Sequence, residues 1–161
     1  MFVDIKRLFD TCESIEEYSF SPDLSAEDFP GYTVADTVSV SIQVQPEAGG
    51  LLVKAAVSAT VFTQCARCLA DIQKPVKFEA ECLIREVDLA GEELDMSITP
   101  NGKLDVKELA YTELVLRVPG VLLCSNDCKG LCPVCGKRKP CECKTEEAVD
   151  ERLAILKQLL S

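Results

Sequence analysis

The ten cysteines are the residues of this sequence whose type and spacing could do chemistry. Eight of them form four close pairs, at positions 65/68, 124/128, 132/135 and 141/143, and two stand alone at 12 and 82. Thiolates a few residues apart are the usual ligands of structural zinc, and two pairs complete a tetrahedral site. We therefore predict one or two structural zinc ions held by the paired residues Cys65, Cys68, Cys124, Cys128, Cys132, Cys135, Cys141 and Cys143.

The strongest of these signals is the segment Cys132-Pro-Val-Cys135-Gly136, because Pro and Gly allow the tight turn in which two sulfurs reach one cation. The sequence leaves the grouping of the pairs open. In one arrangement 65/68 joins 124/128, and 132/135 joins 141/143. In another, 124/128 joins 132/135, and the other two pairs meet or remain free. Thiolate spacing alone is also compatible with an iron–sulfur cluster, and for the solitary Cys12 and Cys82 we expect small, buried or half-buried apolar side chains.

Redox chemistry at Cys65 and Cys68 is the alternative to metal binding at that pair. Redox-active Cys-x-x-Cys pairs lie at a helix N-terminus in a βαβ unit, whereas the residues after Cys68 alternate as a strand does. The chain has no histidine, which excludes His-based triads and imidazole ligands. A zinc ion closed by four thiolates also leaves no position for substrate or water. We therefore predict a protein that is not an enzyme and has no small-molecule substrate.

Composition predicts a folded chain in a reducing compartment. The chain has 161 residues, of which 47% are hydrophobic and 27% charged, as in globular proteins. A chain of this size can bury a core without disulfides. The charged N-terminal residues 1–7 contain no apolar run typical of secretion, and no apolar stretch is long enough to span a membrane. We expect a cytoplasmic protein with no membrane partner.

Three extended segments and two helices are predicted to position the cysteines. Residues 32–45 and 51–63 place apolar residues two apart, with turn residues at 46–50 between them, and residues 76–84 alternate apolar with charged residues. This pattern predicts an antiparallel meander with one solvent-facing side. Asp105 begins a helix over 105–118 in a capping box, in which Asp105 caps the amide of Glu108 and Glu108 reaches back. A second helix is predicted over 150–160, whereas residues 1–30 show only a short extended segment around 2–5.

These elements predict an α+β fold, with an antiparallel β-sheet, two or three helices and a C-terminal Cys-rich zinc-binding lobe. We expect a sheet domain over 1–120. Residues 121–161 would form the zinc lobe and a terminal helix that packs back on the sheet domain. The acidic residues 86–95 repeat no ligand spacing, so we interpret them as a solvated loop rather than a site for a hard cation.

The distribution of charged residues indicates what kind of partner the chain could bind. The net charge of −10 gives the whole chain no broad attraction for nucleic acid. Between Cys124 and Lys144, however, five basic residues face two acidic ones, and Lys137, Arg138 and Lys139 are consecutive. This local patch is a candidate contact for RNA phosphates, and the alternative is an ordinary solvated loop tip.

The order of these motifs resembles the YceD family of bacterial and plastid proteins. The resemblance rests on Cys65-Ala-Arg-Cys68-Leu69, on Leu104-Asp105 before a helix that ends at Val118-Pro119, and on the later segments Cys124, Cys128-Lys-Gly-Leu-Cys132-Pro-Val-Cys135-Gly136, Cys141-Glu-Cys143 and Asp150-Glu-Arg152-Leu153. It implies a non-enzymatic ribosome-biogenesis factor that supports the accumulation or processing of large-subunit (23S) rRNA. The implied partner is that rRNA, a ribosomal protein or an assembly factor.

The chain departs from the family pattern at two places. It has Lys137-Arg-Lys-Pro140 where relatives commonly carry an Asn/Leu-rich turn, and Asp150-Glu-Arg152 where they commonly have Asp-Pro-Arg. Some relatives also lack the second cysteine cluster, so metal cannot by itself be the shared activity. The rival hypothesis is a thiol redox or metal-responsive protein that uses the Cys65/Cys68 pair.

Overall fold

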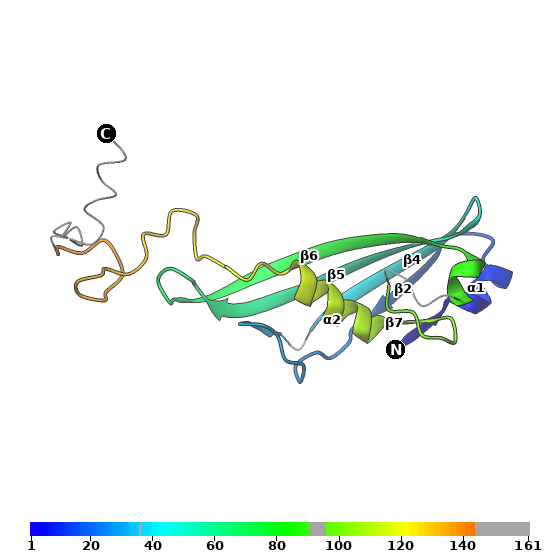
Figure 1. Cartoon of the computed structure of the whole chain (residues 1–161), viewed down its shortest axis with the longest axis horizontal. Helices are drawn as coiled ribbons and strands as arrows, with labels where there is room; N and C mark the ends of the chain where they lie inside the picture. The colour runs from blue at the N-terminus through cyan, green and yellow to red at the C-terminus, as the bar shows by residue number, and fades with distance from the viewer. Residues whose placement is uncertain (36, 91–95, 144–161) are drawn as a thin grey trace, which may run out of the picture.

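The structure is a computed structural model that describes residues 1–35, 37–90 and 96–143. Within these residues the chain forms antiparallel sheets, helices and a Cys-rich C-terminal segment, which confirms the predicted α+β class (Figure 1). The larger sheet contains β2 (Glu16–Phe20), β3 (Thr33–Val34), β4 (Ser39–Glu47), β5 (Gly50–Gln64) and β6 (Asp71–Ile84). The remaining elements are β1 (Phe2–Asp4), α1 (Ile5–Thr11), the 3-10 helix η1 (Glu86–Ala90), β7 (Lys103–Asp105) and α2 (Val106–Arg117).

The long strand β5 organises the sheet. All of β6 pairs with one edge of β5, and the other edge pairs first with β4 and then with β3. Alternate residues of β5 are buried, as the sequence predicts: Val53, Val57 and Val61 are each at most 1% exposed. The predicted meander is therefore confirmed as β4–β5–β6, with β6 beginning at Asp71, five residues before the expected start.

The prediction of one strand over residues 32–45 is wrong, because this segment forms two strands, β3 and β4. Val34 lies opposite Val61 and Ser39 lies opposite Ser58. The chain therefore advances five residues from β3 to β4 while the facing stretch of β5 covers only three. Two extra residues preserve the inward and outward alternation of side chains. Val34 and Val38 are accordingly both buried, and the hydrophobic pattern does not reveal the break between the strands.

Gly50 at the start of β5 is a position where any side chain would collide with β6. A Cβ atom at Gly50 would lie 2.3 Å from the carbonyl oxygen of Ile84. We therefore expect Gly50→Ala to reduce the free energy of unfolding by about 1–3 kcal/mol, since the backbone must shift. Chemical denaturation measures this effect. Gly120→Ala is the control, because a Cβ there meets no atom within 4 Å, and equal effects of the two variants would contradict the prediction.

Helix α2 packs its apolar side on the sheet, and its predicted position over 105–118 is confirmed. Leu109, Ala110 and Leu114 are at most 2% exposed. The hydroxyl of Tyr32 donates a 2.9 Å hydrogen bond to the Leu114 carbonyl, and the Phe29 ring stacks on Tyr32 with ring centres 5.1 Å apart. These contacts tie the loop before β3 to α2 and fix where the chain leaves the helix toward the Cys-rich segment.

The capping box predicted at Asp105 is only half formed. The carboxylate accepts hydrogen bonds from the amides of Lys107 and Glu108 at 3.0 and 3.4 Å. The amide of Asp105 itself donates to the carbonyl of Ser97 at 2.9 Å instead of to the Glu108 side chain. The reason is tertiary: Asp105 ends β7, where its backbone also pairs with Phe2 of β1.

The N-terminal residues contain more structure than their sequence shows. The extended segment expected around residues 2–5 is β1, but α1 and β2 follow it within the first twenty residues. The loop expected over residues 86–95 begins instead as the 3-10 helix η1, at whose start Asp88 accepts a 3.0 Å bond from the Arg85 amide, and residues 91–95 lie outside the described chain. The helix predicted over 150–160 also lies outside it. No helix in the described part is long and apolar enough to span a membrane.

Candidate metal centres

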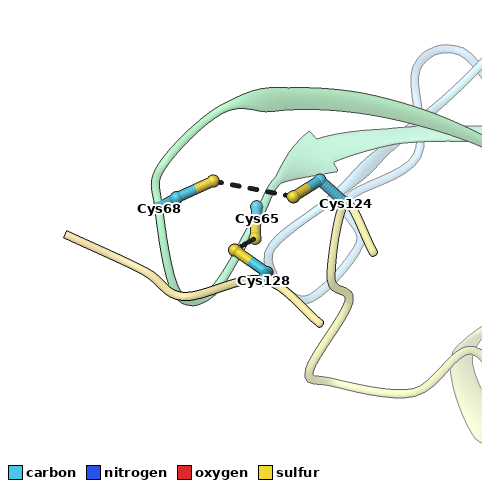
Figure 2. Close-up of side chains that lie close together, drawn as sticks. All are labelled: Cys65, Cys68, Cys124 and Cys128. Carbon is cyan, nitrogen blue, oxygen red and sulfur yellow. Dashed lines mark hydrogen bonds between the residues drawn. The ribbon is translucent and has the colours of Figure 1, made fainter. Parts of the chain in front are cut away.

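Four cysteines converge where the β5–β6 hairpin meets the segment after α2. Cys65 and Cys68 lie in the hairpin turn, whereas Cys124 and Cys128 come from the later segment (Figure 2). The Sγ atoms of Cys65 and Cys128 are 3.8 Å apart, those of Cys68 and Cys124 are 3.7 Å apart, and all four lie within 4.8 Å of one another. Adjacent corners of a zinc–thiolate tetrahedron with bonds of about 2.3 Å are about 3.8 Å apart. This first cluster therefore fits a four-coordinate metal ion.

The hairpin turn has a specific backbone geometry that aims Cys65 and Cys68 at the same point. The Cys65 amide donates to the Ala70 carbonyl at 2.7 Å, and the Leu69 amide donates back to the Cys65 carbonyl at 2.9 Å. Closing this turn requires Leu69 to adopt a left-handed backbone conformation with φ of 55°. The turn leaves the amides of Arg67 and Cys68 free to bond the Cys65 sulfur.

Arg67 joins the turn to the segment that supplies the other two ligands. Its guanidinium Nη1 donates to the carbonyls of Cys128 and Asn126 at 3.1 and 3.4 Å, and its own carbonyl accepts from the Leu131 amide at 3.2 Å. Gly130 has φ of 72°, and a Cβ there would lie 3.0 Å from the Arg67 carbonyl oxygen. Sequence reasoning missed the roles of Arg67 and Gly130. The only available signal was their position inside the Cys-x-x-Cys and Cys-x-x-x-Cys segments.

The remaining paired cysteines form a second cluster. The Sγ atoms of Cys132, Cys135, Cys141 and Cys143 lie within 4.8 Å of one another. The Cys132 amide donates to the Lys137 carbonyl at 2.7 Å, and the Gly136 amide donates to the Cys132 carbonyl at 2.9 Å. These two bonds repeat those of the first turn, with Gly136 at φ of 70° in the place of Leu69. The structure thus groups the eight cysteines in the first of the two arrangements that the sequence left open.

Backbone amides give each cluster one readily ionised thiol. Hydrogen bonds from the backbone of Cys124, and then of Arg67 and Cys68, lower the pKa of Cys65 to about 6. The amides of Cys135 and Val134 likewise lower the pKa of Cys132 to about 6. Such N–H···S bonds stabilise a thiolate, the form in which cysteine binds a metal.

Other thiols of the same clusters ionise reluctantly. The neighbouring thiol of Cys135 and burial raise the pKa of Cys143 to about 12. At Cys128 the Gly130 amide lowers the pKa, but burial and bonds to the neighbouring thiols outweigh it and raise the pKa to about 12. Four adjacent thiolates repel one another, and a bound divalent cation removes that repulsion. The donor set is therefore suited to a soft or borderline divalent ion.

The two clusters differ in their exposure. Cys65 and Cys68 are buried beside Ala70 in a small apolar cluster that is separate from the main core. In the second cluster only Cys132 is buried, and Cys135 is exposed. Complete burial of Cys65 hides the sulfur that a redox function would need to present to a substrate.

The other candidate residues lie outside both clusters. Lys137, Arg138 and Lys139 are exposed on the loop between Cys135 and Cys141 of the second cluster, and their backbone bonds help to close that loop. Cys12 and Cys82, which lie outside the close pairs of the sequence, are half-buried against the main core, as expected.

The left-handed conformation of Leu69 gives a direct test of the turn geometry. A residue with a Cβ pays about 1–2 kcal/mol for this conformation, whereas glycine does not. The Leu69 side chain is 59% exposed, so little apolar burial is lost on its removal. We expect Leu69→Gly to stabilise the metal-loaded protein by about 1 kcal/mol in thermal unfolding. The reverse change at the equivalent position, Gly136→Leu, should destabilise it, and a loss of stability in both variants would contradict this account.

Comparison with known proteins assigns the chain to a family. The model of the family described as "Large ribosomal RNA subunit accumulation protein YceD" matches residues 53–160, which include both cysteine clusters. The chain therefore belongs to the YceD family.

Curated relatives come from mycobacteria. An uncharacterised protein of Mycobacterium tuberculosis is 27% identical over 128 residues, which cover 76% of this chain and 62% of the relative. One of Mycobacterium leprae is 24% identical over 109 residues, which cover 62% of this chain and 48% of the relative. The chain thus spans about half to three-fifths of the length of these relatives. No solved structure gives a significant match.

Proposed function

We propose that the chain is a ribosome-biogenesis factor that supports accumulation or processing of large-subunit (23S) rRNA and acts without catalysis. The single observation that carries the proposal is the family match over residues 53–160, which spans the β5–β6 hairpin, α2 and both clusters. The proposed site of action is the cytoplasm. In this proposal residues 1–120 form the sheet domain, and residues 121–161 form the zinc lobe with a helix that returns to that domain.

The proposed cofactors are two structural zinc ions, one in each cluster. Both clusters offer four thiolate donors whose sulfurs lie within 4.8 Å of one another, which supports zinc. In the first cluster, the sulfur separations of 3.7 and 3.8 Å also match a tetrahedron. When bound, the first ion would cross-link the hairpin turn to the segment after α2, and the second would close the segment from Cys132 to Cys143 on itself. With four protein ligands the ion would be closed to substrate, which supports a structural role.

The proposed partner is large-subunit rRNA, a ribosomal protein or an assembly factor. Lys137, Arg138 and Lys139 offer exposed cations for phosphate contacts, in a chain whose net charge is −10. Because these three consecutive basic residues lie in one loop of an acidic chain, any RNA contact would be local and salt-sensitive.

A deletion strain tests the function. We expect deletion of the gene to lower the amount of mature large-subunit rRNA relative to small-subunit rRNA, and the wild-type gene to restore it. Ribosome sedimentation profiles and rRNA quantification provide the measurement. Normal large subunits and normal rRNA in the deletion strain would contradict the proposed function.

Direct RNA contact has a separate test. Changing Lys137, Arg138 and Lys139 to Gln should weaken binding to rRNA fragments and reduce the slope of log K against log salt by about 2–3, since each lost phosphate contact releases about one counterion fewer. Lys6→Gln is the control, because Lys6 is an exposed lysine of α1, far from that loop in the sequence. Equal salt slopes for wild type and the triple variant would favour a protein partner.

A further inference from the structure

Strand β6 lies at the margin of the sheet, with one edge unused by any strand that the structure describes (Figure 1). The hydrogen bond from the Cys65 amide to the Ala70 carbonyl shows which residues of β6 are hydrogen-bonded to β5, because hydrogen-bonded pairs recur every second residue along the two strands. Even-numbered residues of β6 therefore direct their backbone groups toward β5, and odd-numbered residues direct theirs outward. Two observations agree: the Glu79 carbonyl accepts a bond from Arg117 of α2, and Pro75, which has no N–H, occupies an outward position.

We infer that this edge pairs with the same edge of a second copy of the chain to form a homodimer. With a two-fold axis beside Phe78, the two strands run antiparallel, and Lys77 of each lies opposite the partner's Glu79. Lys77 and Glu79 are both outward-facing positions, so each of these two pairs exchanges two backbone hydrogen bonds. The axis relates the copies by the closed symmetry usual in homodimers.

Side-chain charge selects this register. Lys77 and Glu79 are exposed on the polar face of the sheet, where they already form a 2.7 Å ion pair within the strand. Sliding one strand by two residues in one direction places Lys77 opposite the partner's Lys77. Sliding it in the other direction places Glu79 opposite the partner's Glu79. Like charges directly opposite one another destabilise a strand pair, whereas opposite charges stabilise it.

The apolar face of β6 gives the same register a hydrophobic contribution. Val76, Phe78 and Ala80 are only half-buried at the margin of the main core. In the dimer Phe78 lies opposite the partner's Phe78, and Val76 lies opposite the partner's Ala80. These residues would join the two cores across the interface and bury apolar surface that each chain alone leaves exposed.

Arg117 competes with the partner strand for a backbone group of this edge and therefore weakens the dimer. Its Nη1 donates to the Glu79 carbonyl at 2.7 Å, and its Nε pairs with Glu113 at 2.7 Å. The amide of the partner's Lys77 must bond that same Glu79 carbonyl, so the guanidinium has to leave the edge first. Pro75 has no amide to donate at this edge, which limits the number of backbone hydrogen bonds that any strand can form here.

Sedimentation velocity of the full-length, metal-loaded protein at several concentrations tests the dimer. We expect a concentration-dependent dimer in the wild type, at least about tenfold weaker association in Lys77→Glu, and restored association in the charge exchange Lys77→Glu with Glu79→Lys. Arg117→Ala should associate more tightly. In hydrogen exchange, the amides of residues 77, 79 and 81 should gain protection as the dimer forms.

Several outcomes would overturn the inference. They are a wild type and an Arg117→Ala variant that both stay monomeric at every concentration, or a dimer that Lys77→Glu does not weaken. A double exchange that fails to restore association while thermal unfolding shows it folded would exclude this register. None of these outcomes involves rRNA, so they leave the proposed function untouched.

Discussion

Cys68→Ser is expected to lower the zinc content from two ions per chain to one and to break the contact between the hairpin turn and residues 121–131. The variant removes one of four thiolates from the first cluster, whose Cys68 and Cys124 sulfurs are 3.7 Å apart. Zinc binding supplies on the order of 10 kcal/mol in small zinc domains. Besides the metal, only a small apolar cluster and a few hydrogen bonds, chiefly those of Arg67, are described between the turn and residues 121–131. The strands β4 and β5 belong to the main core and should stay folded.

Metal analysis per chain and residue-resolved hydrogen exchange measure this prediction. Cys12→Ser is the matched control, because Cys12 lies against the main core and bonds the Ser14 carbonyl, so two zinc ions per chain should remain. Cys141→Ser should also leave one ion, but with the first cluster and its exchange protection intact. A zinc content unchanged by Cys68→Ser, or a wild type that binds no metal, would contradict the account of the site.

Leu114→Ala should reduce the free energy of unfolding by about 2–5 kcal/mol, the usual range when a buried leucine leaves a cavity. Leu114 is fully buried on the face of α2 that packs on the sheet, and its carbonyl accepts the bond from Tyr32. The substitution therefore loosens both the helix and the loop before β3. Because domains are stable by only about 5–15 kcal/mol, this single change removes a large share of the total.

The same helix provides a control for Leu114→Ala. Leu116 is 75% exposed, so Leu116→Ala should change the free energy of unfolding by less than about 0.5 kcal/mol. Urea denaturation of the metal-loaded proteins gives both values. Similar losses at the two positions would mean that α2 does not pack as described.

Local patterns in the sequence were enough to predict the elements that later hold the metal. Apolar residues two apart predicted β5, and alternation of apolar with charged residues predicted the part of β6 from Val76 onward, because one face of each strand packs on the core and the other meets water. Asp105 marked the start of α2, because its carboxylate satisfies amides that the first turn leaves free. Cysteine spacing identified all eight residues of the two clusters.

Contacts between distant residues could not be predicted in this way. The short strand β1 is stabilised by β7, about a hundred residues further along the chain. The break between β3 and β4 leaves the apolar alternation unchanged, so the sequence pattern gave no sign of it. Half of the capping box at Asp105 was lost to the Ser97 carbonyl, again a tertiary contact.

The sequence by itself determined which sulfurs come in pairs, because two cysteines in one turn are close for local geometric reasons. Only the tertiary structure decided which pairs meet. The long β5–β6 hairpin carries Cys65 and Cys68 to the place where the chain leaves α2, and Arg67 then fixes the segment that bears Cys128. Two cysteine pairs from separate elements share a cluster only if those elements lie close together, and tertiary packing sets that distance.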